Sequence, residues 1–129
     1  MNYLLDTVTV TRHFSSKGKI GQRATKIIDH AERFGNHTLF VSVVSLFEII
    51  YLFERQRILI SLPIAISMIE SKTCFKVVDS TVPIVKVAKD IPFYEMHDRL
   101  ILATAVHLGV SVISSDEKFD DITGIKRIW

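Results

Sequence analysis

The sequence contains one cysteine, Cys74, in 129 residues. A single cysteine cannot form a disulfide within the chain, and this sparse use of cysteine is typical of proteins from a reducing cytosol. Internal repeats, low-complexity tracts and linker-like stretches are also missing from the sequence. We therefore expect one domain over residues 1–129, stabilised by a hydrophobic core.

An excess of charge of one sign is absent as well. Sixteen Lys and Arg residues stand against fourteen Asp and Glu residues, which gives a net charge of +2. A bias this weak neither demands nor excludes a nucleic-acid partner, because only strongly basic chains are informative in that respect. The placement of individual residues has to indicate whether the chain acts on a nucleic acid.

Long apolar runs are missing too. The most apolar stretch, residues 39–53, is 15 residues long and contains Glu48, whereas a membrane span needs about 20 apolar residues. The first residues show no basic stretch followed by an apolar run and a cleavage site, so we expect no signal peptide. These features predict a cytoplasmic protein without a membrane segment. Its 48% hydrophobic residues suffice for a core and favour a subunit interface in addition.

Short apolar runs alternate with segments of helical periodicity along the whole chain. We expect strands at residues 2–6, 39–42, 75–79, 110–113 and 125–129. We expect helices at residues 19–34, from Ser42 or Ser45 to 55, at 62–71, around 85–88 and at 98–108. Such alternation predicts an α/β fold with a mostly parallel, roughly five-stranded sheet that is covered on both faces. The segment 7–11 is rich in β-branched residues, and propensity alone would extend the first strand through it.

Four acidic residues occupy related places in this pattern. Asp6 ends the first expected strand, Glu48 lies early in the helix after the second, Asp98 opens the helix before the fourth, and Asp116 follows the fourth. Ligands of open α/β sheets bind beyond the carboxyl ends of the strands. Asp98 reaches that edge only if the start of its helix faces it.

Each acid also has a purely structural interpretation. Ser45 and Glu48 match a capping box, Asp98 suits the dipole of a helix N-terminus, and Asp116 suits a turn or an N-cap. Asp6 is harder to explain in this way, because an acid that closes an apolar strand is a poor core residue. The functional interpretation depends on the set of four.

Several carboxylates held close together repel one another and raise each other's pKa unless cations neutralise them. Hard oxygen ligands of this kind suit Mg²⁺ or Mn²⁺. Such ions activate water, orient a phosphodiester and stabilise the charge that develops on its oxygens. The four acids therefore point to metal-dependent chemistry on a phosphodiester.

Four segments that contain these acids resemble the PIN-domain ribonucleases, above all the VapC-type toxins of toxin–antitoxin pairs. They are Leu4–Thr7, Val41–Ile49, His97–Ala105 and Gly109–Phe119. The resemblance implies a three-layer α/β/α sandwich and a metal site formed by the four acids, with Asp6 and Asp98 as the firmest ligands. It also implies that Thr7 and Ser114 orient the carboxylates, that the protein forms a homodimer, and that an antitoxin inhibits it.

Other residues receive weaker assignments. Arg99 and Lys118 are candidate contacts to substrate phosphates, and Asp120 and Asp121 lie near a position where some family members carry a further acid. A larger group of aromatic residues is expected in the core or a dimer interface rather than against bases: Phe40, Phe47, Tyr51 and Phe53.

The sequence thus predicts an Mg²⁺- or Mn²⁺-dependent endoribonuclease. Two other functions stay open: a non-catalytic module of the same fold that binds RNA or a protein, and a nuclease directed at DNA or flap structures. The RNA target is not predicted, because recognition of single strands depends on surface shape and stacking.

Overall fold

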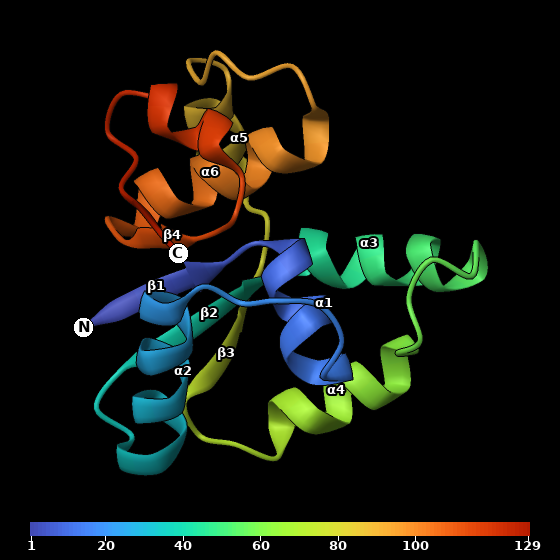
Figure 1. Cartoon of the computed structure of the whole chain (residues 1–129). Coiled ribbons are helices and arrows are strands. Elements are labelled where there is room, and N and C mark those ends of the chain that lie inside the picture. Colours follow the sequence, from blue (N-terminus) through green and yellow to red (C-terminus); the bar gives the residue numbers. More distant parts are fainter.

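The chain forms one sheet with helices on both sides in the computed structural model, which describes all 129 residues (Figure 1). The strands are β1 (Asn2–Leu5), β2 (Thr38–Ser42), β3 (Phe75–Val78), β4 (Ser111–Ile113) and β5 (Arg127–Ile128). The helices are α1 (Thr7–Ser15), α2 (Gln22–Phe34), α3 (Val43–Glu54), α4 (Leu62–Glu70), α5 (Val82–Ala88), α6 (Met96–Leu108) and the 3₁₀ helix η1 (Glu117–Asp121). The expected alternation of strands and helices is confirmed.

All neighbouring strands are parallel, in the order β3-β2-β1-β4-β5. The first strand is therefore the central one. Its last residue, Leu5, lies opposite Val41 of β2 and Ile113 of β4. This register makes the three strands end at nearly the same level, so residues that follow them meet at one edge, called here the carboxyl edge.

Side chains of β1 alternate between two hydrophobic cores, as the pleat of a strand requires. Tyr3 and Leu5 pack with residues of α1, α2 and α4, whereas Leu4 packs with residues of α5 and α6. Figure 1 shows these two groups of helices on opposite faces of the sheet. The predicted three-layer α/β/α sandwich is confirmed.

The β-branched segment after Asp6 is helical, so the extension of the first strand through Thr11 is wrong. Asp6 has an extended backbone and caps α1, because its Oδ1 accepts a hydrogen bond from the backbone N–H of Thr9 (2.9 Å). A cap of this kind satisfies one of the free N–H groups at a helix start. Together with the burial of Val10 and Phe14 against the core, it outweighs the β-propensity of the segment.

The structure decides where two helices begin: α3 follows Ser42, the first of the two expected starts, whereas α6 begins before its expected start. The side chain of Ser42 caps α3 by accepting from the N–H of Val44 (3.1 Å). Ser45 therefore lies inside α3, and its interpretation as part of a capping box with Glu48 is wrong. Helix α6 begins at Met96 with Glu95 as its N-cap, two residues before the expected start.

None of the helices combines the length and the hydropathy that are needed to cross a membrane. Cys74 is a free, buried cysteine, as its use as a small core residue predicts. Several large apolar side chains nevertheless remain exposed, among them Leu59, Ile64, Val82 and Val85.

Candidate active site at the carboxyl edge

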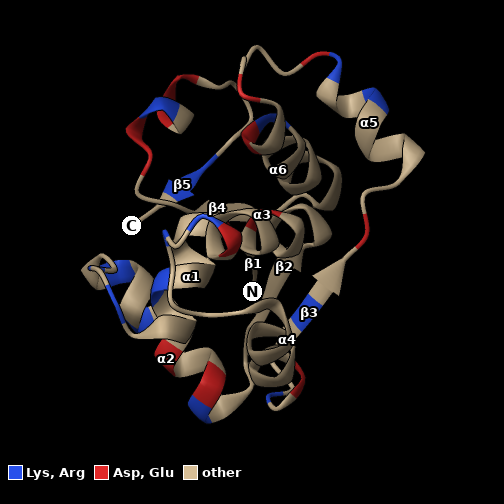
Figure 2. Cartoon of the chain, turned by 90° about the vertical axis from the view of Figure 1, so that its right-hand side faces the viewer, with Lys and Arg blue, Asp and Glu red and all other residues tan.

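The carboxyl edge gathers side chains from β1, α3, α6 and the segment after β4. Figure 2 looks onto this edge, with α3 pointing toward the viewer and acidic segments at the start of α6 and along α3. The fold brings these segments together because α3 directly follows β2 and packs against α6, while β4 lies beside β1.

Asp6 is held rigidly, with only 4% of its surface exposed. Its Oδ1 accepts hydrogen bonds from the N–H (2.9 Å) and hydroxyl (2.6 Å) of Thr9, and its Oδ2 accepts one from the hydroxyl of Ser114 (2.5 Å). Burial raises the pKa of Asp6, although these hydrogen bonds oppose the increase. The carboxylate is thus fixed between the start of α1 and the end of β4.

Glu48 is oriented by a hydroxyl from the neighbouring helix. Thr7 Oγ1 donates to Glu48 Oε1 (2.6 Å) and lies 2.9 Å from the hydroxyl of Ser45. Burial raises the pKa of Glu48, while the hydrogen bond from Thr7 opposes the increase. Thr7 and Ser114 therefore each contact one of the four predicted acids.

Asp98 has the most strongly perturbed carboxyl group of the edge. Burial, followed by the charges of Glu95, Glu48, Asp6 and Asp116, raises its pKa to about 7. No cationic side chain counts among the causes. The other three predicted acids therefore all act electrostatically on Asp98, and no cationic side chain opposes them there.

Asp116 lies at the start of η1, where it caps the short helix. Its Oδ1 accepts from the N–H of Lys118 (3.0 Å), and its own N–H donates to the hydroxyl of Ser114 (3.0 Å). The capping interpretation of Asp116 is therefore right, and it does not compete with a functional one, because the same carboxylate also raises the pKa of Asp6 and of Asp98.

Glu95 is an acid of this edge that the sequence does not single out. Its Oε2 accepts from the N–H of Asp98 (2.5 Å), and its Oε1 lies 2.8 Å from Nδ1 of His97. Burial alone would raise the pKa of Glu95, but these hydrogen bonds outweigh it and the pKa lies below its usual value. An acid three residues before Asp98 fits an N-cap position. The sequence does not reveal this role, because the helix is expected to begin only at Asp98.

Some candidate residues have partners elsewhere. Arg99 donates from Nε to the carbonyl of Ala88 (2.6 Å) and from Nη2 to that of Lys89 (3.0 Å), at the end of α5. The guanidinium thus links α6 to the end of α5, and its contact with a substrate phosphate stays a prediction. Asp120 pairs with Arg127 through both carboxylate oxygens (2.9 and 3.0 Å). Such a pair disfavours a metal role for Asp120.

The four acids fit a hard divalent cation by their chemistry, since they are oxygen ligands with unbalanced charge. As the side chains stand, no three Asp, Glu, His or Cys residues lie close enough together to ligate one ion. This spacing is compatible with the coordination of Mg²⁺, which is usually bound by one or two carboxylates and keeps several water ligands. Asp6 and Asp98, which act on each other electrostatically, are the two residues of the set that could hold it.

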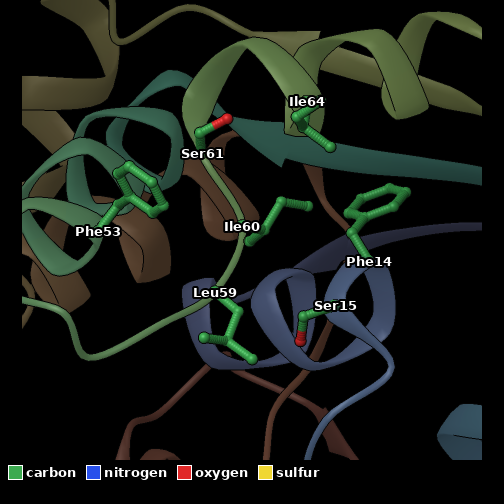
Figure 3. Close-up of a pocket in the computed structure, with 7 residues that line it drawn as sticks. All are labelled: Phe14, Ser15, Phe53, Leu59, Ile60, Ser61 and Ile64. Atoms are coloured by element: carbon green, nitrogen blue, oxygen red, sulfur yellow. The ribbon is translucent and has the colours of Figure 1, made fainter.

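A depression in the surface lies away from the acids, between α1, α4 and the end of α3. Figure 3 shows its lining of Phe14, Ser15, Phe53, Leu59, Ile60, Ser61 and Ile64. Its volume is about 260 Å³, and none of these side chains ionises near neutral pH. This apolar hollow suits an apolar side chain rather than catalysis.

The same fold occurs in known proteins of solved structure. The chain resembles VapBC2 from Rickettsia felis, bound to a DNA fragment from its promoter (TM-score 0.74, 14% identity, 99% of this chain and 98% of that chain). It also resembles DNA-bound VapBC from Salmonella typhimurium (0.72, 17%, 99% and 97%). A third similar structure is Mycobacterium tuberculosis VapC20, a toxin that cleaves the Sarcin-Ricin loop (0.65, 14%, 96% and 98%).

The family assignment comes from the sequence itself. No curated protein sequence matches the chain. The model of the PIN domain family, however, matches residues 3–125, a range that includes all of β1 except Asn2, all six α-helices and the four predicted acids of the carboxyl edge. The chain belongs to the PIN domain family.

Proposed function

We propose that this protein is a metal-dependent endoribonuclease that hydrolyses RNA phosphodiester bonds, and that it is the toxin of a toxin–antitoxin pair. The observation that carries the proposal is the gathering of Asp6, Glu48, Asp98 and Asp116 at the carboxyl edge, where burial and then the charges of Glu95 and of the other three acids raise the pKa of Asp98. A cluster of carboxylates of this kind suits a divalent cation that in turn attracts a phosphate.

The roles of the four acids follow from how firmly each is held. Asp6, with both oxygens fixed by hydroxyl or N–H donors, and Asp98, at the start of α6, are assigned as the metal ligands. Glu48 and Asp116 complete the site or hold the attacking water. A bound Mg²⁺ or Mn²⁺ would lower the pKa of a water molecule and stabilise charge on the phosphate oxygens.

The toxin assignment is supported by the structural neighbours. Two of those named above are VapBC toxin–antitoxin proteins bound to DNA, and a third is an RNA-cleaving toxin. We extend this to a cognate antitoxin for the present chain, with the apolar hollow of Figure 3 as a candidate contact. An RNA substrate would place the enzyme in the cytoplasm, and we expect it to act as a homodimer.

Cleavage assays with single-site variants test the proposal. We expect the wild-type protein to cleave single-stranded RNA with Mn²⁺ or Mg²⁺ and to lose this activity in excess EDTA. Asp6→Asn and Asp98→Asn should each abolish cleavage while the circular dichroism spectrum stays native. Asp90→Asn, at an exposed carboxylate beyond α5, is the matched control and should cleave like the wild type.

The same assay separates the other functions that the sequence leaves open. Full activity in EDTA would refute the metal step. RNA binding without turnover in any divalent metal would instead indicate a binding module. A preference for DNA or flap substrates over RNA would move the enzyme to another class of nuclease.

A further inference from the structure

A cavity of about 430 Å³ lies directly beside the carboxyl edge, between α3 and the start of α6. It is lined by Phe47, Glu48, Tyr51, Leu52, Glu95 and His97. Its volume is within the range of about 300–1,000 Å³ that is usual for small-molecule pockets. We call it the α3–α6 cavity.

Two aromatic side chains form one wall of this cavity. Phe47 and Tyr51 lie one turn apart on α3, and 65% and 51% of their respective surfaces are exposed. They do not belong to the core, so of the two expected positions, core or dimer interface, the core position is wrong for both, and the dimer interface stays a prediction. Adjacent exposed aromatic rings beside an open pocket are the usual stacking surface for unpaired bases.

Glu48 connects the cavity with the candidate active site. Its Oε1 accepts the hydrogen bond from Thr7, next to Asp6, whereas its Oε2 lies 3.9 Å from Nδ1 of His97 in the cavity wall. The α3–α6 cavity therefore adjoins the carboxyl edge through a shared side chain.

The charges around the cavity select a base rather than a phosphate. Two carboxylates, Glu48 and Glu95, belong to the lining and repel an anionic phosphate. The guanidinium of Arg55 stacks over one face of the Tyr51 ring, with its central carbon 3.4 Å from the ring centre, so a base would have to use the other face. We expect this cation to contact the next phosphate along the strand.

A second copy of the chain fits this surface less well. The cores of subunit interfaces are depleted of charged residues. Covering the α3–α6 cavity would take Glu48 and Glu95 out of water with no Lys or Arg partner among the lining residues, which costs free energy, and would also close one side of the candidate active site. An unpaired nucleobase covers the rings and leaves the carboxylates in water.

We propose that the α3–α6 cavity binds one unpaired base of a single-stranded RNA, stacked on Phe47 and Tyr51, next to the phosphate at the carboxyl edge. The inference rests on the proposed ribonuclease function. It adds a subsite that holds the strand through a base rather than through its backbone.

The test measures binding of fluorescein-labelled twelve-nucleotide oligo(A), oligo(C) and oligo(U) RNA by anisotropy, in an Asp98→Asn background that leaves the RNA intact. Phe47→Ala and Tyr51→Ala should each weaken binding by about 5- to 100-fold, the usual loss for one stacked base. Tyr51→Phe keeps the ring and should bind within about twofold of the background. Phe34→Ala, at an equally exposed aromatic at the end of α2, is the matched control and should have no effect.

Two further measurements distinguish base stacking from a backbone contact. An RNA with one base removed should bind more weakly at a single position, and Tyr51→Ala should cause no further loss with that RNA. Arg55→Gln should reduce the salt dependence of binding by about 0.7 in the logarithmic slope, as expected for one lost phosphate contact on a single strand, whereas Tyr51→Ala should leave the slope unchanged.

Equal binding by the background, Phe47→Ala and Tyr51→Ala would overturn the proposal, as would a background that binds none of the three RNAs. A change of the wild-type oligomeric state caused by Tyr51→Ala in sedimentation would assign the rings to an interface between copies and also overturn it. A wild-type protein that binds RNA through Tyr51 but cleaves none with Mn²⁺ would instead retain this subsite and refute the ribonuclease function.

Discussion

Asp98 shows how a single residue couples the candidate site to the stability of the whole chain. In the folded protein its pKa is raised to about 7, whereas in an unfolded chain it returns to about 3.9. The folded, metal-free protein therefore binds the proton more tightly than the unfolded chain does. This difference in pKa leaves the free energy of unfolding unchanged below about pH 4. It lowers the free energy of unfolding as the pH rises toward 7, and the loss persists above that value.

Removal of this charge should stabilise the metal-free protein. We expect Asp98→Asn to increase the free energy of unfolding at pH 8 by about 1–2 kcal/mol, since the carboxyl is only partly buried and water screens part of the repulsion. The gain should be smaller at pH 5. Urea denaturation in EDTA at both pH values measures it, with Asp90→Asn as the control. A gain that is equal at pH 5 and pH 8, or a loss, would contradict the electrostatic explanation.

Thr7 offers a second test at the residue scale. Thr7→Val keeps the shape of this buried side chain but removes the hydroxyl that donates to Glu48 (2.6 Å). Loss of such a supporting hydrogen bond typically reduces metal affinity or activity by about 10–100-fold. We expect a decrease of this size in single-turnover RNA cleavage and in Mn²⁺ affinity measured by calorimetry.

The conservative variant serves as the control for this prediction. Thr7→Ser restores the hydroxyl and should recover most of the activity. Equal losses in Thr7→Ser and Thr7→Val would show that the methyl group of Thr7, and not its hydrogen bond to Glu48, matters.

Sequence patterns predict the acids of the carboxyl edge better than the residues that hold them. Asp6 is conspicuous because an acid closes an apolar strand. Glu95 is not, because its place depends on a side-chain hydrogen bond to the backbone of Asp98, which fixes the start of α6. The contact of Ser45 with Thr7 joins residues 38 positions apart and follows only from the packing of α1 against α3.

At the scale of elements, Arg99 joins α6 to α5. Its guanidinium donates to the carbonyls of Ala88 and Lys89 at the C-terminal end of α5, where helix carbonyls lack partners. We expect Arg99→Ala to lower the free energy of unfolding by about 1.5–3 kcal/mol, the usual value for a hydrogen bond to a charged group. Urea denaturation measures this loss.

RNA binding distinguishes this role from the contact to phosphate that the sequence suggests. Arg99→Lys presents one ammonium group in place of a fork with two donors, so we expect only partial recovery of stability. The affinity for RNA should stay unchanged in both variants. A stable Arg99→Ala protein with weakened RNA binding would restore Arg99 as a substrate residue.

The layers of the fold could be predicted, but not the order of its strands. Alternating apolar and helical segments indicate a parallel sheet with two covered faces, which the structure has. The order β3-β2-β1-β4-β5 depends on which side of β1 each later strand joins, and no local pattern encodes that choice. Local patterns also fail for the segment Thr7–Thr11, because the Asp6 cap and the core contacts of α1 outweigh the β-propensity of these residues.

At the scale of the whole molecule, apolar surface remains that a second subunit would cover. Val82 and Val85 of α5 are both exposed, on the opposite face of the sheet from the hollow that Leu59 and Ile64 line, and a stable interface buries about 800 Å² on each partner. We expect a homodimer in sedimentation velocity at micromolar concentrations, dissociating on dilution. A monomer at every concentration would exclude the dimer and leave this surface to another partner.

The central place of β1 also determines when the site is complete. Asp6 lies 108 positions before Ser114, whose hydroxyl fixes its carboxylate, and Asp116 comes later still. Because synthesis runs from the N-terminus, a nascent chain lacks part of the carboxyl edge until the segment with Ser114 and Asp116 has emerged. Under the proposed ribonuclease function, this delay would spare the messenger that is being translated.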